Sequence, residues 1–366
     1  MFVSKVIFLK ICVYAISKNE EKFIDRWMDS VNEADAVYVL DTGSTDKTVE
    51  KLKKRGAIVK QKIIKPWRFD VARNESLDMV PEDTDICVCI DIDEVLEKGW
   101  RKKIEQLWKP DTTRLKYNYI WSFDEYGNPA VNFYSEKIHH RKNYRWVNPV
   151  HEILNYDGLE KTLITDELTI SHYPDPTKSR SSYLPLLELA VEENPNNDRN
   201  MHYLGREYMY YQKHNESIDT LIKHLEMPSA TWKDERCASM RFIARSYIGL
   251  KRLEEASMWY EKAIHEAHYL REAYVEKANL EYTRENYHEA YNLLAKALEI
   301  KEKSNSYINE EFCWNHFIYD LMSINAFLIG KNVEAIKYCE EAHRLNPNDI
   351  RIKNNLEIMR EEKNNE

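Results

Sequence analysis

Apolar residues follow two different rhythms along the chain, and the change between them falls near residue 176. In the first part, short apolar runs alternate with stretches in which apolar positions recur every three or four residues, as in buried strands and amphipathic helices respectively. The pattern predicts strands at 11–16, 36–40, 57–61 and 85–90, and helices at 20–31, from about 45 to 54, and at 69–79. This alternation indicates an α/β domain with a mostly parallel sheet, whose ligands bind at the carboxyl ends of the strands.

The segment 115–141 departs from this alternation because it is β-rich and aromatic around a turn at 126–129. It predicts an antiparallel addition to the sheet, with His139 and His140 at an exposed strand end. His172 ends a further strand just before the Pro174 and Pro176 boundary. We therefore expect one domain at 1–176 and a second at 177–366.

Amphipathic helices fill nearly all of the second part, and their openings resemble one another. Similar openings stand at 215–218, 253–256, 287–290 and 332–335. Ala256 and Ala290 occupy equivalent places 34 residues apart, which is the tetratricopeptide period. The neighbouring steps of 39 and 45 residues indicate repeats that are degenerate or carry insertions. The pattern predicts an all-α tetratricopeptide-like domain, with tyrosines packed inside the repeats at Tyr203, Tyr208, Tyr210 and Tyr211.

Composition agrees with two folded domains. The chain has 366 residues, of which 43% are hydrophobic, and a formal net charge of -9. Two cores are the usual solution at this length. A net acidic chain with interspersed charges is not built around wholesale nucleic-acid backbone binding, although a local basic patch is compatible with it.

The six cysteines form neither a zinc spacing nor a disulfide framework, so we expect them in the core. The apolar stretch at 6–16 is interrupted by Lys10 and is too short to span a membrane. No small-residue cleavage site follows it. The sequence predicts a cytoplasmic, soluble protein.

Two carboxylates, Asp91 and Asp93, follow the fourth predicted strand directly. Side chains two residues apart at a strand end can reach one hard cation together, and such a cation bridges nucleotide phosphates. The alternative is an ordinary solvated loop, because carboxylates after strands are common. The surrounding segments decide between the two.

Three of these segments are expected at the same edge of the sheet: ISKNEE at 16–21, DTGSTD at 41–46 and WRFDVARN at 67–74. Ser44 or Thr45 is expected to cap the following helix. Together with the Asp-x-Asp segment, the three resemble glycosyltransferase family 2, the inverting GT-A enzymes, in order and spacing. The resemblance covers roughly the first half of the chain and implies a Rossmann-like GT-A fold and a nucleotide-sugar donor.

The resemblance also implies roles for individual residues. Asp41 would accept a hydrogen bond from uracil, Arg73 would pair with the donor diphosphate, and Asp93 would bind Mn²⁺ or Mg²⁺ directly. The remaining nucleotide-sugar contacts would come from Ile16, Ser17, Lys18, Asn19, Glu20, Asp91 and Ile92. Taken singly, these residues have simpler interpretations: Asp41 and Asp46 could be turn and cap residues, and Arg73 could pair with Asp70 across a helical turn.

Inverting transfer also needs a base that takes the acceptor proton. Glu152 is the first candidate and Asp124 the second, because the Glu-Asp pair common in the family is not visible here. His172 stands where GT-A enzymes often place a histidine metal ligand, and Asp91 is a second candidate ligand. A structural hydrogen bond is the alternative use of His172.

The combination of domains suggests an acceptor. Family 2 domains fused to such repeats resemble the peptide S-glycosyltransferases of glycosylated bacteriocins, which favours a Ser, Thr or Cys side chain of a peptide or protein. A glycan, a lipid-linked saccharide or modified DNA is the alternative acceptor. A scaffold with a degenerate catalytic half is the alternative outside the enzymes, and self-association is another use of the repeats.

Overall fold

The computed structural model describes residues 9–124, 127–177 and 182–365. The chain divides into two compact units, Met1–Ala190 and Val191–Glu366. The helix α5 (Tyr183–Glu193) has residues on both sides of this division. Tyr126, from the predicted turn, lies outside the described residues.

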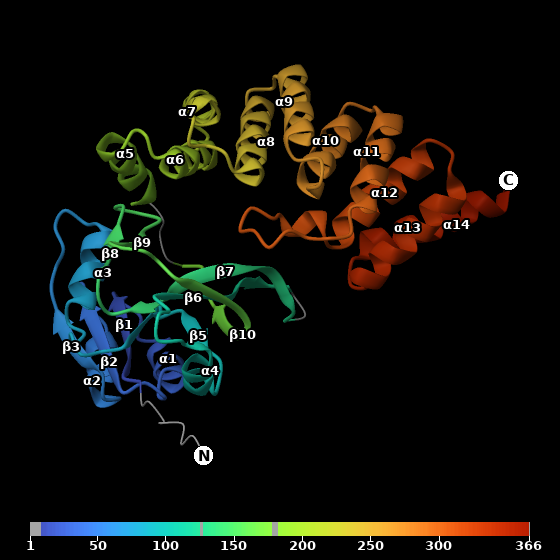
Figure 1. Cartoon of the computed structure of the whole chain (residues 1–366). Helices are drawn as coiled ribbons and strands as arrows, with labels where there is room; N and C mark the ends of the chain where they lie inside the picture. The colour runs from blue at the N-terminus through green and yellow to red at the C-terminus, as the bar shows by residue number, and fades with distance from the viewer. Residues whose placement is uncertain (1–8, 125–126, 178–181, 366) are drawn as a thin grey trace, which may run out of the picture. The chain divides into compact units, whose positions relative to one another are not determined.

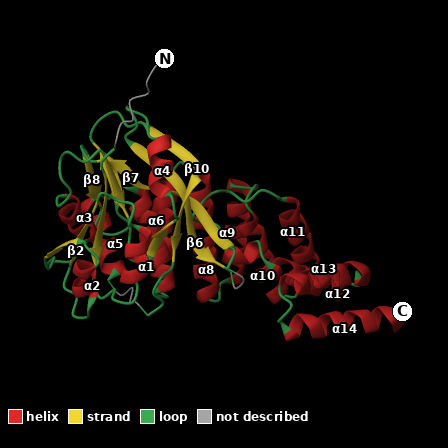
Figure 2. Ribbon diagram, turned by 90° about the horizontal axis from the view of Figure 1, so that it is seen from below, coloured by secondary structure: helices red, strands yellow, loops and turns green. Residues whose placement is uncertain are grey.

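The N-terminal unit is built on an eight-stranded sheet (Figures 1 and 2). Its strands are β1 (Ile11–Ser17), β2 (Ala36–Asp41), β3 (Ile58–Gln61), β4 (Ile86–Cys89), β5 (Glu94–Leu96), β6 (Arg114–Phe123), β7 (Pro129–His140) and β10 (Thr162–His172). The order is β3-β2-β1-β4-β7-β6-β10-β5. Strands β1 to β4 run parallel, whereas β7 pairs antiparallel with β4 and with β6. The predicted mostly parallel sheet with an antiparallel addition is confirmed.

Both faces of the parallel part are covered, which explains its nearly continuous apolar strands. Ile11, Val13 and Ala15 of β1 share one core with α1 (Ile24–Ser30), α2 (Thr48–Lys54) and α4 (Trp100–Leu107). Cys12 and Tyr14 face a second core with the end of α3 (Phe69–Leu77) and with the small sheet of β8 (Tyr144–Val147) and β9 (Ile153–Tyr156). Alternate residues of one strand thus serve two cores.

Three local predictions about this unit are wrong. Helix α1 begins at Ile24, four residues later than predicted, after a turn at 21–23. Neither Ser44 nor Thr45 caps α2; Asp46 Oδ1 accepts from the Thr48 backbone N–H at 3.0 Å instead. His139 is fully buried rather than exposed, because β7 lies inside the sheet.

The C-terminal unit consists of helices paired along the sequence (Figure 1). They are α6 (Asp198–Tyr210), α7 (His214–Glu226), α8 (Lys233–Gly249), α9 (Leu253–Glu266), α10 (Arg271–Thr283), α11 (Tyr287–Glu299), α12 (His316–Leu328), α13 (Asn332–Leu345) and α14 (Ile350–Asn365). Their most extensive contacts lie within the pairs α6/α7, α8/α9, α10/α11 and α12/α13. Each predicted opening coincides with the second helix of a pair, which confirms the tetratricopeptide-like prediction.

The irregular repeat steps have structural causes. Helix α8 has 17 residues where α6 and α10 have 13, which lengthens one step. Residues 300–315, including the short 3₁₀ helix η1 (Glu311–Cys313), separate α11 from α12 and lengthen the other. This insertion bonds back to the preceding helices: Ile308 O accepts from Arg241 Nη2 at 3.1 Å, and Ile300 O from Arg271 Nε at 2.8 Å.

The predicted burial of the cysteines is confirmed for all six. The prediction for the tyrosines holds for Tyr203, which is buried, but Tyr210 and Tyr211 are exposed at the end of α6 and beyond it. Within the described ranges, no helix has the length and apolar character needed to cross a membrane.

Candidate functional site

The loops that follow β1 and β2 are tied to each other at the carboxyl edge of the sheet. Ser44 Oγ accepts from the Asn19 backbone N–H at 2.8 Å, and Asn19 Oδ1 accepts from the Thr45 N–H at 2.8 Å. Thr48 Oγ1 accepts from the Glu20 N–H at 2.7 Å. Hydrogen bonds of short polar side chains therefore connect the two loops, which explains the density of Ser, Thr and Asn in both segments.

Asp41 is fully buried at the end of β2 and organises its own loop. Its Oδ1 accepts from the backbone N–H groups of Gly43 at 3.2 Å and Ser44 at 3.0 Å. Its Oδ2 accepts from the Ser17 hydroxyl at 3.2 Å. Gly43 has φ +111°, a conformation that other residues rarely adopt. The turn role considered for Asp41 is therefore present, and the predicted contact with a nucleobase stays a prediction.

Arg73 lies between two carboxylates. Its Nη1 is 2.8 Å from Asp91 Oδ1, and its Nε is ion-paired with Glu152. The Arg73 side chain is 7% exposed, and its guanidinium stands 5.0 Å above the Trp146 ring. Asp70 pairs with Arg68 instead, so the interpretation of Arg73 as an intrahelical partner of Asp70 is wrong.

Glu152 comes to Arg73 because α3 is fastened to β8 and to the loop between β8 and β9. Asn74 Nδ2 donates to Trp146 O at 2.8 Å, and Asn74 Oδ1 accepts from the Trp146 N–H at 2.9 Å. The Phe69 N–H donates to Pro149 O at 3.0 Å. Two candidates far apart in the sequence, Arg73 and Glu152, are thereby brought together.

Sequence reasoning missed Lys137, which completes this cluster. Its Nζ lies 2.9 Å from Asp91 Oδ2 and 2.6 Å from Glu94 Oε1. Glu94 Oε1 also accepts from the Tyr119 hydroxyl at 2.7 Å. In the sequence, Lys137 resembles any outward residue of a strand. The strand register could have found it, because β7 pairs antiparallel with β4 and Lys137 precedes Ile138, the partner of Val88 near the end of β4.

In this cluster, burial disfavours the charged form of each side chain, whereas opposite charges nearby favour it, and the pKa values reflect both effects. Burial acts to raise the pKa of Asp91, but Arg73 and Lys137 hold that pKa well below its usual range. Burial acts to lower the pKa of Lys137, but Asp91 and Glu94 raise it well above the usual value. The pKa of Glu94 is raised, because burial and the neighbouring Asp91 outweigh Lys137.

Asp93 and His172 form a separate pair beside this cluster. His172 ends β10 opposite Glu94 of β5, and its Nε2 lies 3.6 Å from Asp93 Oδ2. Its Nδ1 is 3.1 Å from Trp121 O. A carbonyl oxygen can only accept, so Nδ1 carries the proton and the Nε2 side faces Asp93. Burial acts to lower the pKa of His172, but Asp93 and the Trp121 carbonyl raise it above its usual value.

This pair fits a divalent cation. Two atoms that bind one metal ion at about 2.0–2.1 Å can lie up to about 4.2 Å apart, and the Asp93–His172 separation of 3.6 Å is within that limit. Histidine ligands usually donate their second N–H to a carbonyl or carboxylate, as His172 does. Asp91, in contrast, faces two cationic side chains, so its predicted metal contact would need those ion pairs to open.

The charge of the whole site also suits a cation. Four carboxylates, those of Asp91, Asp93, Glu94 and Glu152, accompany two cationic side chains, Arg73 and Lys137. When all are ionised, the group has two more negative than positive charges. Arg73 is already neutralised by two carboxylates, so its predicted contact with a diphosphate also stays a prediction.

Not all of the predicted site residues belong to this cluster of charged side chains. Asp124 is in the turn after β6, where its Oδ1 accepts from the Asn128 N–H at 2.7 Å. Ile92 is 2% exposed and belongs to the first core of the sheet. Lys18 and Asn19 are exposed, whereas Ser17 and Glu20 are buried. The sequence predicted all of these near the site, but Asp124 bonds within its own turn and Ile92 packs in the core.

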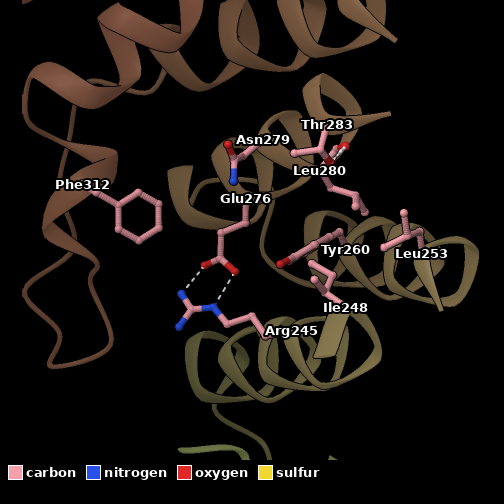
Figure 3. Close-up of a pocket in the computed structure, with 9 residues that line it drawn as sticks. All are labelled: Arg245, Ile248, Leu253, Tyr260, Glu276, Asn279, Leu280, Thr283 and Phe312. Carbon is pink, nitrogen blue, oxygen red and sulfur yellow. Dashed lines mark hydrogen bonds and ion pairs between the residues drawn. The ribbon is translucent and has the colours of Figure 1, made fainter. Parts of the chain in front are cut away.

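A hollow of about 360 Å³ lies within the C-terminal unit, among α8, α9, α10 and η1 (Figure 3). Arg245 and Glu276 pair across it, with Arg245 Nη2 2.7 Å from Glu276 Oε1. Asn279 is an exposed amide one turn further along α10, and Phe312 of η1 closes the other side. The hollow therefore combines an aromatic wall, an ion pair and an amide that can both donate and accept.

Part of the N-terminal unit is similar to known glycosyltransferases. Residues 12–151 match the family Glycosyl transferase family 2. An uncharacterized glycosyltransferase of Rickettsia bellii is 37% identical over 106 residues, which are 29% of this chain and 35% of that protein. One of Rickettsia typhi is 38% identical over 100 residues, 27% of this chain and 33% of that protein. The chain thus spans about a third of the length of these curated relatives.

Solved structures similar to part of the chain include a thermophilic TPR protein of Thermus thermophilus, with 15% identity, a TM-score of 0.36, and coverage of 49% of this chain and 89% of that one. Another is Tom70 of yeast, with 13% identity, a TM-score of 0.39, and coverage of 52% and 37%. The repeat architecture described here rests on the helix pairs of the chain itself. The chain thus joins a segment, residues 12–151, that matches Glycosyl transferase family 2 to a tetratricopeptide-like unit.

Proposed function

We propose that this chain transfers a sugar, with inversion, from a UDP-sugar to a Ser, Thr or Cys side chain of a peptide or protein, with the help of Mn²⁺ or Mg²⁺. One observation carries the proposal. The Asp93–His172 pair lies beside the buried Arg73–Asp91 ion pair, in a site with an excess of negative charge and inside a family 2 domain. Such a site needs a cation before it can accept the diphosphate of a nucleotide sugar.

The donor would lie along the two linked loops at the edge of the sheet. The backbone of Ile16, Ser17 and Lys18 would face the uracil and ribose, and Asp41 would accept from the base. Hydrogen bonds that the Asn19 and Thr48 side chains accept from backbone N–H groups hold these loops in place, which lowers the ordering cost when the nucleotide binds. Asp91 would lie near the ribose, held by Arg73 and Lys137.

The metal ion would be held by Asp93 and His172, with substrate phosphates completing its coordination. When bound, it would offset the negative charge of the diphosphate and of the departing UDP. The role of this chain is then to keep His172 in the right tautomer through Trp121 O and to keep Asp93 beside it.

Glu152 would act as the base. It takes the proton from the acceptor hydroxyl or thiol while that oxygen or sulfur forms a bond to the anomeric carbon from the face opposite UDP. The bond from that carbon to the diphosphate oxygen breaks at the same time, and UDP leaves with the electron pair. The ion pair with Arg73 fixes the position of the Glu152 carboxylate, whereas Asp124 is tied to its own turn.

The repeat unit would select the acceptor. The hollow between α8, α9, α10 and η1 offers Asn279 to a peptide backbone and Phe312 to an apolar side chain. Binding energy gained there, on groups of the acceptor that do not react, would position an extended acceptor. A glycan, a lipid-linked saccharide or modified DNA is the alternative acceptor.

A thermal-shift panel of nucleotide sugars, each with and without Mn²⁺ or Mg²⁺, tests the proposal. A ligand that binds the folded state at 100 times its Kd stabilises that state by about 2.7 kcal/mol. We expect UDP-sugars with metal to raise the Tm, and His172→Gln to lose that rise. The matched control His265→Gln, an exposed histidine of α9, should keep it. A panel in which no UDP-sugar shifts the Tm would contradict the donor assignment.

A further inference from the structure

A second group of metal-binding side chains is buried in the C-terminal unit, and none of its members belongs to the proposed donor site. His202 of α6, His224 of α7 and Glu235 of α8 each offer one ligand atom, and these atoms lie within 4.8 Å of one another. His202 and His224 are fully buried, and Glu235 is 5% exposed. Three consecutive helices thus direct ligand-type atoms at one point inside the unit.

Ser239 fixes the orientation of both imidazole rings. Its Oγ lies 2.7 Å from His202 Nδ1 and 3.0 Å from His224 Nδ1. With the Nδ1 atoms held by one hydroxyl, the Nε2 atoms are the ones that remain for Glu235, and His224 Nε2 is 3.4 Å from Glu235 Oε1. Metal-binding histidines show this arrangement, in which an outer hydrogen bond at one nitrogen orients the other.

His202 Nε2 has no hydrogen-bond partner within the ranges that the structure describes, although it is completely buried. A buried polar atom without a partner costs free energy that a bound cation would recover. Core histidines that serve only packing are normally satisfied at both nitrogens or reach solvent. The unpartnered atom therefore points to a ligand.

We propose that His202, His224 and Glu235 form a Zn²⁺ site. Two imidazole nitrogens and one carboxylate oxygen are a donor set that Zn²⁺ binds, with bonds of about 2.0–2.2 Å. Atoms bound to one such ion lie at most about 4.4 Å apart, and the ligand atoms of the group, all within 4.8 Å of one another, need to approach by no more than some tenths of an ångström. Rotation of the Glu235 carboxylate supplies this. Ser239 Oγ, with two lone pairs, can accept from both Nδ1–H groups once Zn²⁺ binds.

The site would fasten more than its own three helices. The second oxygen of Glu235, Oε2, accepts from the Tyr307 hydroxyl at 2.6 Å, and Tyr307 belongs to the insertion at 300–315 that supplies Phe312 to the hollow. A Zn²⁺ ion at Glu235 would therefore hold α6, α7 and α8 together and keep the insertion in place. The role is structural, because all three side chains are closed off from solvent.

Metal content tests the proposal. The full-length chain carrying Asp93→Ala, which removes the other metal-binding pair, is expressed with zinc, dialysed and analysed for zinc per chain. We expect one equivalent, with a Tm that falls when a chelator strips the ion. Adding His202→Gln should remove the equivalent, whereas adding His265→Gln, an exposed histidine of the same unit, should leave it.

A fully buried substitution can disturb the unit by itself, so a second variant keeps all three ligands. Ser239→Ala should weaken zinc binding about 10- to 100-fold, as loss of an outer hydrogen-bond partner does. The Ser239→Ala chain loaded with Co²⁺ should show the visible absorption of an ion bound by two imidazoles and a carboxylate. No bound zinc in the Asp93→Ala chain would overturn the proposal and leave a hydrogen-bonded core cluster. Equal zinc content in the His202→Gln and His265→Gln chains would overturn it as well.

Discussion

Each unit of the molecule has a buried network of cationic side chains and carboxylates, and the two networks differ in their net charge. In the C-terminal unit, Arg241 and Arg245 meet Glu276 and Glu310, two charges of each sign. In the N-terminal unit, Arg73 and Lys137 meet more carboxylates than they can neutralise. The first network is complete by itself, and the second has negative charge left over.

This difference in net charge indicates a different role for each network. A balanced, buried group of ion pairs can fix how helices pack, although it adds little net stability. A group with excess negative charge at the edge of a sheet, next to the Asp93–His172 pair, favours the binding of a cation. Similar side chains thus form a scaffold in one unit and, as we propose, a donor site in the other.

The largest effect should follow from Asp93→Ala. It removes a proposed metal ligand without touching the core, so donor turnover should fall by about a thousandfold or more while the fold stays intact. Metal-dependent hydrolysis of a UDP-sugar measures it. Asp83→Ala, which removes an exposed carboxylate paired with Lys10, is the matched control. Near-normal hydrolysis in Asp93→Ala would show that the metal assignment is wrong.

Glu276→Gln should break the balanced network instead. It leaves two arginines, Arg241 and Arg245, with Glu310 as their one remaining carboxylate in the network. Unfolding should therefore become easier by about 3–5 kcal/mol, while donor hydrolysis by the folded protein stays unchanged. Chemical denaturation measures the loss, with the exposed Glu216→Gln of α7 as control. A loss equal to that of the control would mean that the network contributes nothing to packing.

The same variant predicts a pH dependence. Burial acts to raise the pKa of Glu276, but Arg245 and Arg241 lower it to about 2. A depressed carboxyl pKa stabilises the folded state above the ordinary value of about 4.3 and loses that effect as the pH falls toward the folded value. The stability gap between wild type and Glu276→Gln should therefore be full at pH 7 and narrow below about pH 4.3. A constant gap down to pH 2 would contradict this origin.

Glu152→Gln should reduce transfer roughly a hundredfold by removing the base, with donor binding little changed. Asp124→Asn is the matched comparison, and it should remain active. The reverse result would move the base to Asp124. A cysteine acceptor would make the effect smaller, because a thiol ionises more readily than a hydroxyl.

The smallest effect is expected in the hollow of the repeat unit. Asn279→Ala should raise the acceptor KM about tenfold, as expected for about 1.4 kcal/mol of lost binding, and should leave donor hydrolysis unchanged. Asn292→Ala, an exposed amide of α11, serves as control. Equal KM values for the two variants would place the acceptor elsewhere.

Much of the fold could be predicted because its signals are local. Apolar runs located β1, β2 and β4, and the recurring openings located α7, α9, α11 and α13. The predicted start of α1 and the predicted cap of α2 were wrong because polar side chains bond across two loops rather than within one helix. These side chains are Asn19, Ser44 and Thr45. Burial of His139 was missed because it depends on which strand lies next to β4.

The sequence predicted several residues of the site, but it did not predict the contacts between them. Motif positions named Arg73, Asp91 and Glu152, but they could not reveal that Arg73 joins the other two. Lys137 carries no motif, and its place follows only from the pairing of β7 with β4. The buried group around His202 was not predicted either, because its members come from three different helices and are brought together only by helix packing.

Hydrogen exchange with UDP and Mn²⁺ tests the central claim most directly. The account predicts slower exchange at backbone amides of 16–20, 41–46 and 91–93 when both are present, a much weaker effect with either alone, and no change in α6 to α14. Asp93→Ala should abolish the joint effect. Protection confined to the repeat unit, or protection by UDP that is the same with and without Mn²⁺, would contradict a metal-dependent donor site at the edge of the N-terminal sheet.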